Sequence, residues 1–266
     1  MAQEKTPRTI SMPVSIVYFI ISIIINSLGN VLTLVTSAKV FPHFLGSAYW
    51  TAAETNLSIA IHWDLFWTFV LVGIIIIILN AILIGKWDWG RAVGNLIFMI
   101  PFSWLVQVFY DLFTQIIRLP DAHTPLLITI YVLVNFIGVA LIGIAISIYQ
   151  RVNLVLHPND DLMQILRFKY FKGNATKAMW ASYIPPTIVE IIAFLITHQI
   201  EYYGIGTIFA FLFQGSITGV ADRLVFPRLK HQGISTTPAK SESMVAKDID
   251  TDKQKATKDR NGKRKW

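Results

Sequence analysis

The sequence predicts an all-α membrane protein with six transmembrane helices, and three observations carry this prediction. Hydrophobic residues make up 54% of the 266 residues, and charged residues only 15%, against the ~25% of ordinary soluble domains. Six apolar runs each approach the ~20 residues that a helix needs to cross a ~30 Å hydrocarbon layer. Lysine and arginine are concentrated in alternate connections between these runs. The runs cover residues 14–38, 65–85, 92–113, 126–149, 179–199 and 203–221.

The positions of the basic residues predict an orientation for these helices. With the N-terminus in the cytoplasm, only Lys39 and Arg118 of the 23 basic residues lie on the outer side. Cytoplasmic connections of multispan proteins carry an excess of lysine and arginine, so both termini are expected in the cytoplasm. The first run is also much longer than the core of a signal peptide, which predicts a retained helix.

Residues 231–266 form a different kind of segment. From Arg223 onward the chain carries twelve basic and five acidic residues, which accounts for the whole formal net charge of +7. Few large apolar side chains and no periodicity predict a disordered, basic cytoplasmic tail beyond a transmembrane domain at 1–230. Binding to nucleic acid is not expected, because no folded platform accompanies these charges.

The two halves of the hydrophobic region share one plan. Ile97-Phe98 precedes Asp111 by the same spacing with which Ile208-Phe209 precedes Asp222, an offset of 111 residues. Each half has a span, a polar connection (39–64 or 150–178) and two spans joined by a short turn. Because three spans are an odd number, the second copy enters from the opposite face. The sequence therefore predicts two inverted repeats, at about 14–113 and 126–222, as in many secondary transporters.

Short motifs in these segments point to a known family. Residues 46–53 are Gly-Ser-Ala-Tyr-Trp-Thr-Ala-Ala, followed by Asn-Leu-Ser at 56–58, and residues 158–163 are Pro-Asn-Asp-Asp-Leu-Met. Residues 204–207 are Gly-Ile-Gly-Thr, seven residues before Gln214-Gly215. In order and spacing these segments resemble the YczE/YitT-type bacterial membrane proteins, over roughly residues 14–229.

This resemblance implies a multispan protein of the bacterial plasma membrane. Some family members are called sugar-specific permeases, so the resemblance supports the architecture more than an activity. It places Trp50 within the first motif and matches Glu190 to an acidic position of the family. Tyr49 and Thr51 stand where the family has proline and aspartate, so a coupling role for that aspartate is not carried over.

Glu190 is the sharpest candidate for a substrate or proton pathway. It lies near the centre of the fifth run, where an ionised carboxylate costs at least ~2.5 kcal/mol unless it is hydrated or paired. Such carboxylates face the bundle interior and often relay protons. A protonated carboxyl hydrogen-bonded to a neighbouring helix is the alternative. Pro185-Pro186 is expected to break this helix and free backbone carbonyls, with a simple kink as the alternative.

Other polar residues complete the predicted pathway. Asp111 and Asp222 are gate candidates at opposite interfaces, or they mark helix ends in water. Asn80 is a candidate for a hydrogen bond between helices. Glu54 is a candidate for an outer vestibule. The remaining candidates are Trp50 from the first motif and Asp160 and Asp161 on the inner side, for one of which a helix N-cap is the simpler role.

Enzyme, metal and cofactor chemistry are not predicted. The chain has no His-Glu-Xaa-Xaa-His, no Gly-Xaa-Ser-Xaa-Gly and no phosphate-binding loop, and it has no cysteine. Nothing fixes three metal ligands on one face.

The sequence therefore predicts a permease for a small solute that works by alternating access, with proton coupling through Glu190 as its sharper part. The alternatives are a substrate-binding membrane subunit that needs an ATPase, and a membrane sensor or assembly factor. Besides lipid, the solute is the expected partner, and a homo-oligomer remains open.

Overall fold

A computed structural model describes residues 8–172, 175–230 and 232 of the chain. Within these residues, six helices are long and apolar enough to cross a membrane. They cover Met12–Lys39, Leu65–Ile84, Trp89–Ile116, Pro125–Val152, Lys177–Thr197 and Ile205–Leu224, so the six predicted spans are confirmed to within a few residues. Large apolar side chains such as Ile74, Ile78 and Ile82 are exposed on these helices, as contact with a lipid bilayer requires.

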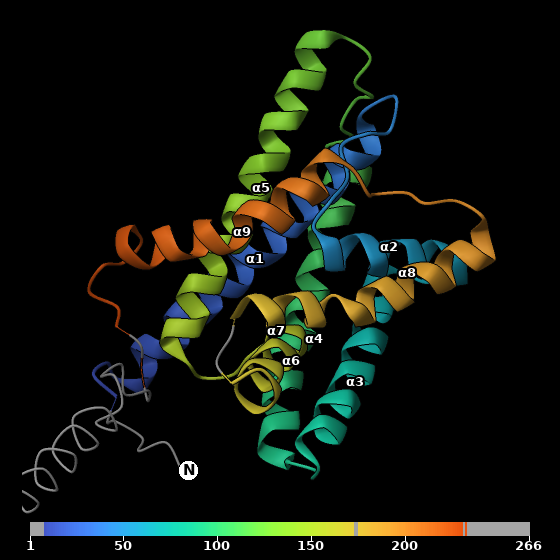
Figure 1. Cartoon of the computed structure of the whole chain (residues 1–266). Coiled ribbons are helices and arrows are strands. Elements are labelled where there is room, and N and C mark those ends of the chain that lie inside the picture. The colour runs from blue at the N-terminus through green and yellow to red at the C-terminus, as the bar shows by residue number, and fades with distance from the viewer. Residues whose placement is uncertain (1–7, 173–174, 231, 233–266) are drawn as a thin grey trace, which may run out of the picture. The chain divides into compact units, whose positions relative to one another are not determined.

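The order of elements repeats in the two halves (Figure 1). Each half has a long helix, a short helix and a helical hairpin. The short helix α2 is matched by α6 with its π-helical extension η2, which together cover the same length of chain. The elements are α1 (Met12–Lys39), α2 (Tyr49–Ile61), α3 (Leu65–Ile84), α4 (Trp89–Asp111), η1 (Leu112–Ile116), α5 (Pro125–Val152), α6 (Pro158–Ile165), η2 (Leu166–Tyr170), α7 (Ala175–Ser182), α8 (Ile184–Thr197) and α9 (Ile205–Leu224).

The two long helices α1 and α5 pack against each other in opposite directions. The end of α1 meets the approach to α5, where the backbone N–H of Ala122 donates to the carbonyl of Lys39 at 2.7 Å. The helices cross at Gly29 and Gly138, where a Cβ on either glycine would come within 2.8 Å of the other's carbonyl oxygen. Small residues permit such close crossings between membrane helices. First helices that run antiparallel are what an inverted repeat requires.

The connections between helices fall into two groups. At the outer end (40–48, 117–124 and 198–204), the N–H of Ser47 donates to the carbonyl of Tyr202 at 2.7 Å. At the inner end (85–88, 153–157 and 225–230), Arg91 pairs with Asp161 at 3.0 Å. The names follow the predicted sides of the membrane. The grouping itself is the one that the predicted topology demands.

Aromatic side chains fill the core where α1, α3, α4 and α5 meet. Phe98 of α4 is completely buried, and its ring meets Phe19 of α1 at 5.5 Å and Tyr149 of α5 at 4.9 Å, both edge to face. Such pairs contribute about 0.5–1.5 kcal/mol beyond the burial of their area.

The fifth span is broken, as the proline pair predicts. Helix α7 ends at Ser182 and α8 begins at Ile184, with a proline in its first turn. Proline suits that position, because its missing N–H would have no partner within the helix.

Residues 9–230 form one compact unit, and residues 1–7 at the start of the chain are not described. The predicted tail at 231–266 lies outside the described residues, apart from Gln232.

Candidate functional site

Two buried carboxylates on neighbouring elements form the strongest candidate site. Glu54 of α2 and Glu190 of α8 are 3% and 9% exposed. The side-chain amide of Asn56 lies 2.9 Å from both carboxylate oxygens of Glu190 and 2.6 Å from the carbonyl oxygen of Glu201. Asn56 therefore joins α2, α8 and the 198–204 turn. Among the described residues, the hydrogen bonds of the Glu190 carboxylate come from this uncharged amide alone.

Tyrosines surround these carboxylates. The ring of Tyr49 lies 4.7 Å from that of Tyr183 and 5.3 Å from that of Tyr203. Burial raises the pKa of the Tyr203 phenol, and the negative charges of Glu190 and Glu54 raise it further. Tyr203 therefore stays protonated, and its hydroxyl donates to the backbone carbonyl of Tyr49 at 3.4 Å.

Glu54 lies on α2, one of the two short helices. Leu57 of α2 and Leu162 of α6 share an apolar cluster, so the two short helices, one from each half, meet. Burial raises the pKa of the Glu54 carboxyl well above its ordinary value, and the side chain of Asn159 on α6 opposes this shift. The prediction that Glu54 lines an outer vestibule stays a prediction.

A tight backbone contact holds α2 in place at the outer end. The N–H of Ile205 at the start of α9 donates to the carbonyl of Phe44 at 2.9 Å, and the N–H of Gly206 donates to that of Leu45. A Cβ on Gly204 would lie 2.0 Å from the carbonyl oxygen of Phe44. The Gly-Ile-Gly-Thr motif is thus explained by the close approach of the segment that leads into α2.

The two halves exchange their short helices. Helix α2 packs on α8 of the second half, and α6 packs on α3 of the first half. Asn80 of α3 donates to the carbonyl of Pro158 at 3.1 Å, while Glu190 of α8 accepts from Asn56 of α2. Asn80 and Glu190 are 110 residues apart. They occupy corresponding places, each holding the short helix of the other half.

The inner connection places its polar residues differently from the prediction. The N-cap of α6 is His157, whose Nδ1 accepts from the N–H of Asn159 at 3.3 Å, so the expectation that an aspartate caps this helix was wrong. Burial lowers the pKa of His157 to about 3, which keeps Nδ1 free to accept. Asp160 accepts from the hydroxyl of Tyr149, and Asp161 pairs with Arg91.

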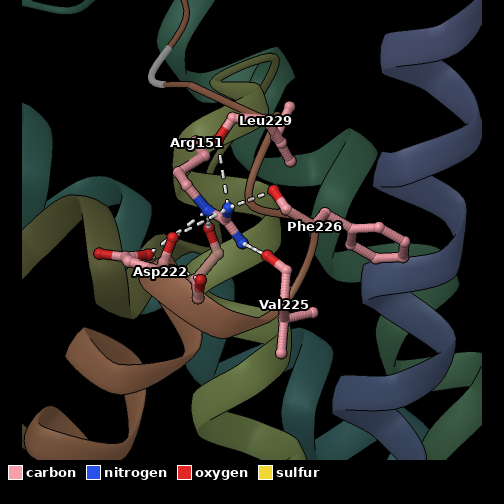
Figure 2. A network of polar contacts seen from close by, with 6 residues as sticks. Arg151, Asp222, Val225, Phe226 and Leu229 are labelled. Carbon is pink, nitrogen blue, oxygen red and sulfur yellow. Dashed lines mark hydrogen bonds and ion pairs between the residues drawn. The ribbon is translucent and has the colours of Figure 1, made fainter.

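Asp222 belongs to a network around Arg151 at the end of α5 (Figure 2). The Arg151 side chain is 2% exposed and lies 3.4 Å from Oδ1 of Asp222. Its guanidinium also donates to the backbone carbonyls of Val225, Phe226 and Leu229 at 2.9–3.1 Å. One buried cation therefore binds the carbonyls at and just beyond the C-terminus of α9, where cations are favourable.

Two further candidates, Asp111 and Trp50, make other contacts. Asp111 ends α4 and accepts from Gln107 and Gln115 at 3.0 and 2.9 Å. Trp50 packs against an apolar cluster that includes Val72 and Leu162. The structure therefore brings Glu54 and Glu190 close to the same tyrosine, while Asn80 and Asp161 lie at the inner end.

Two further residues carry more of the arrangement than the sequence alone suggested. Arg151 counted only as one of many basic residues, although a charge in the last turn of a long apolar helix was a usable signal. Asn56 appeared only as part of a motif.

A comparison with protein families places the whole hydrophobic region. Residues 11–223 match the model of a family of unknown function, DUF6198. The chain belongs to this family. The matched region runs from the start of α1 almost to the end of α9, so the DUF6198 match covers both halves. No curated protein and no solved structure matches the chain. The resemblance to YczE/YitT-type proteins stays a prediction.

Proposed function

We propose that this DUF6198 protein is a secondary transporter that moves a small solute by alternating access. The observation that carries the proposal is the exchange of α2 and α6 between antiparallel halves, with Glu54 and Glu190 buried where the exchanged helices meet their partners. Secondary transporters place their sites at such repeat interfaces, near the middle of the bilayer.

Glu190 is the residue through which we expect proton coupling. An ionised carboxylate within a span costs at least ~2.5 kcal/mol unless it is hydrated or paired. Asn56 provides only an uncharged amide. Movement of α2 against α8 would hydrate Glu190 or bury it again, so proton uptake and release would accompany opening and closing.

The test is uptake into proteoliposomes under an imposed pH gradient. The solute is the first compound from a metabolite panel that raises the melting temperature of the purified protein. Glu190→Gln should abolish the pH-dependent part of uptake. Glu201→Gln is the matched control, because the Glu201 side chain is exposed and only its carbonyl contacts Asn56. Unchanged uptake by Glu190→Gln would remove Glu190 from the mechanism.

Removal of the tail separates a carrier from a sensor. A chain shortened to residues 1–230 should still transport if the helical unit is the working part. Loss of uptake by a correctly folded, shortened chain would favour a signalling role for residues 231–266.

A further inference from the structure

The short helices of the two halves lie in segments of opposite charge. Between Asp161 and Glu190 the chain contains four basic residues and no acidic one. The four are Arg167, Lys169, Lys172 and Lys177. Residues 40–64 of the first half, which include α2, contain no lysine or arginine and carry Glu54 and Asp64. The two halves therefore differ in charge where they correspond in structure, so the basic segment of the second half needs an explanation of its own.

Two side chains of η2 fasten this basic segment to the inner end of α3. The last carbonyls of a helix have no partner within the helix. Nζ of Lys169 donates to the carbonyls of Leu83 and Ile84 at 2.8 and 2.6 Å. The hydroxyl of Tyr170 donates to the carbonyl of Leu83 at 2.7 Å. The η2 segment therefore lies directly beside the turn between α3 and α4.

Three exposed ammonium groups belong to these two segments, and we call them the basic patch: Lys86, Lys169 and Lys172. None of the three forms an ion pair with a carboxylate in the part of the chain that the structure describes. A Cβ on Gly85 would lie 3.9 Å from Nζ of Lys169, so this ammonium is next to the backbone that carries Lys86. An ammonium group has three N–H donors, and Lys169 therefore keeps one beyond its two carbonyls.

The carboxylates near the basic patch are engaged elsewhere. Oδ1 of Asp88 accepts from the backbone N–H of Arg91 at 3.1 Å and caps α4. Oδ1 of Asp161 pairs with the Arg91 guanidinium at 3.0 Å. The basic patch and Arg91 together carry four positive charges against the two negative charges of these carboxylates. This place therefore suits an anion.

Exposed aromatic and aliphatic side chains flank the basic patch. Trp87 and Trp89 are 46% and 72% exposed, and their ring centroids lie 5.4 Å apart. Tyr170 is 47% exposed, and Ile82 in the last turn of α3 is 68% exposed. Tryptophan and tyrosine favour the membrane–water interface, where basic residues attract anionic headgroups. A soluble anion would not use these apolar side chains, whereas a phospholipid would contact them with its acyl chains.

We propose that the basic patch binds the headgroup of an anionic phospholipid in the leaflet at the inner end of the bundle. The phosphate oxygens accept hydrogen bonds from the ammonium groups of Lys86, Lys169 and Lys172. Because α3 belongs to the first half and η2 to the second, the lipid links the two halves at this end. The binding does not depend on transport, so this proposal and the proposed function fail separately.

The test is lipid binding by the purified full-length chain in detergent. Phosphatidylglycerol is titrated into the micelles with the melting temperature as the readout, beside phosphatidylcholine as the neutral lipid and glycerol phosphate as the soluble phosphate. Phosphatidylglycerol should produce a saturable rise in melting temperature, because it binds the folded state. The other two compounds should produce no rise. An equal rise with phosphatidylcholine or with glycerol phosphate would overturn the proposal.

Three charge variants locate the site. Lys86 and Lys172 are exposed, so Lys86→Gln and Lys172→Gln should fold. Each should weaken the apparent affinity for phosphatidylglycerol about fivefold, as expected for one basic residue near anionic lipid. Arg118→Gln is the matched control, because it removes the same charge from an exposed position at the outer end and should keep the wild-type affinity. Wild-type affinity in both lysine variants, or an equal loss in Arg118→Gln, would show that net charge alone attracts the lipid and would overturn the proposal.

Discussion

The two hairpins of the molecule are made of corresponding parts but are packed differently. In the first half, α3 packs along α4. The buried share of the most apolar 18-residue stretch is 39% for the α3 span and 44% for the α4 span. In the second half, the extended connection at 198–204 separates the end of α8 from the start of α9 (Figure 1), and 22% of the most apolar 18-residue stretch of each span is buried. Within the described residues, Phe211 of α9 contacts Trp180 and Tyr183, but α8 and α9 do not pack along their length.

This difference shows that one plan of elements supports two arrangements. In carriers built from inverted repeats, alternating access is largely a movement of one repeat or bundle against the other. If the chain is such a carrier, the loosely packed α8 and α9 are the helices that we expect to move.

The ends of the two long helices extend the comparison and give the largest expected effect. Arg151 near the end of α5 is buried and donates to three carbonyls, and its partner Asp222 is 36% exposed; Lys39 at the end of α1 meets Asp121 at 2.8 Å with both side chains at least 32% exposed. Loss of the donor to a buried polar group costs about 1–3 kcal/mol per group, whereas an exposed pair contributes about 0–1 kcal/mol. We expect Arg151→Met to lower the melting temperature in detergent far more than Lys39→Met. Equal losses would show that the Arg151 network does not hold α9.

Glycines give a smaller effect with an equally clear contrast. A methyl group on Gly29 would meet the carbonyl oxygen of Gly138 at 2.7 Å, whereas Gly215 on α9 has nothing within 4 Å of its added Cβ. Overpacking costs about 1–3 kcal/mol, so Gly29→Ala should destabilise the chain. Gly215→Ala should be neutral or slightly stabilising, because alanine favours the helix by about 1 kcal/mol. Thermal unfolding of both variants checks this. A greater loss from Gly215→Ala would place an unseen contact on α9.

The smallest expected effect is a pH dependence of folding stability, which has opposite signs at the inner and outer ends. Burial raises the pKa of Asp160 at the inner end to about 6 from its ordinary 3.8. Between these values the folded state holds a proton that the unfolded state has released, so this group's contribution to stability falls as pH rises from about 4 to 6. Asp160→Asn should remove that fall in melting temperature.

At the outer end the sign is reversed. The hydrogen bond and charge of Lys39 lower the pKa of Asp121. The contribution of Asp121 to folding stability is therefore lost as pH falls below the ordinary aspartate pKa of 3.8. Asp121→Asn should leave the fall in melting temperature between about pH 4 and 6 unchanged. A wild-type fall that survives in Asp160→Asn would assign it to another group.

The sequence predicted the parts of this fold that depend on hydrophobic length and charge. The six spans, their two groups of connections and the break before Pro185 required only apolar runs, basic residues and proline chemistry. The exchange of α2 and α6 was not predictable in this way, because their polar residues show no clear period and their partners lie in the other half. Asn56 and Asn80 differ from the other asparagines of the sequence only in the residues that they contact in the folded chain.

The same limit applies to the candidate site. A carboxylate within an apolar run identified Glu190, because that position is costly in any fold. Glu54 lies in a polar stretch where carboxylates are ordinary, and only the packing of α2 buries it. Arg151 looked like one of many cytoplasmic charges until the end of α9 was placed around it. Gly29 and Gly138, each three residues after an asparagine, repeat between the halves and could have marked the helix crossing.

The relation between the halves can be measured directly, because the chain contains no cysteine. Single cysteines replace Lys86, in the turn between α3 and α4, and Ile200, in the corresponding turn between α8 and α9; both positions are exposed. A membrane-impermeant maleimide is applied to intact cells and then to permeabilised cells. We expect Ile200→Cys to be labelled in intact cells, and Lys86→Cys only after permeabilisation. Labelling of both from the same face would contradict the inversion of the two halves and with it the proposed carrier.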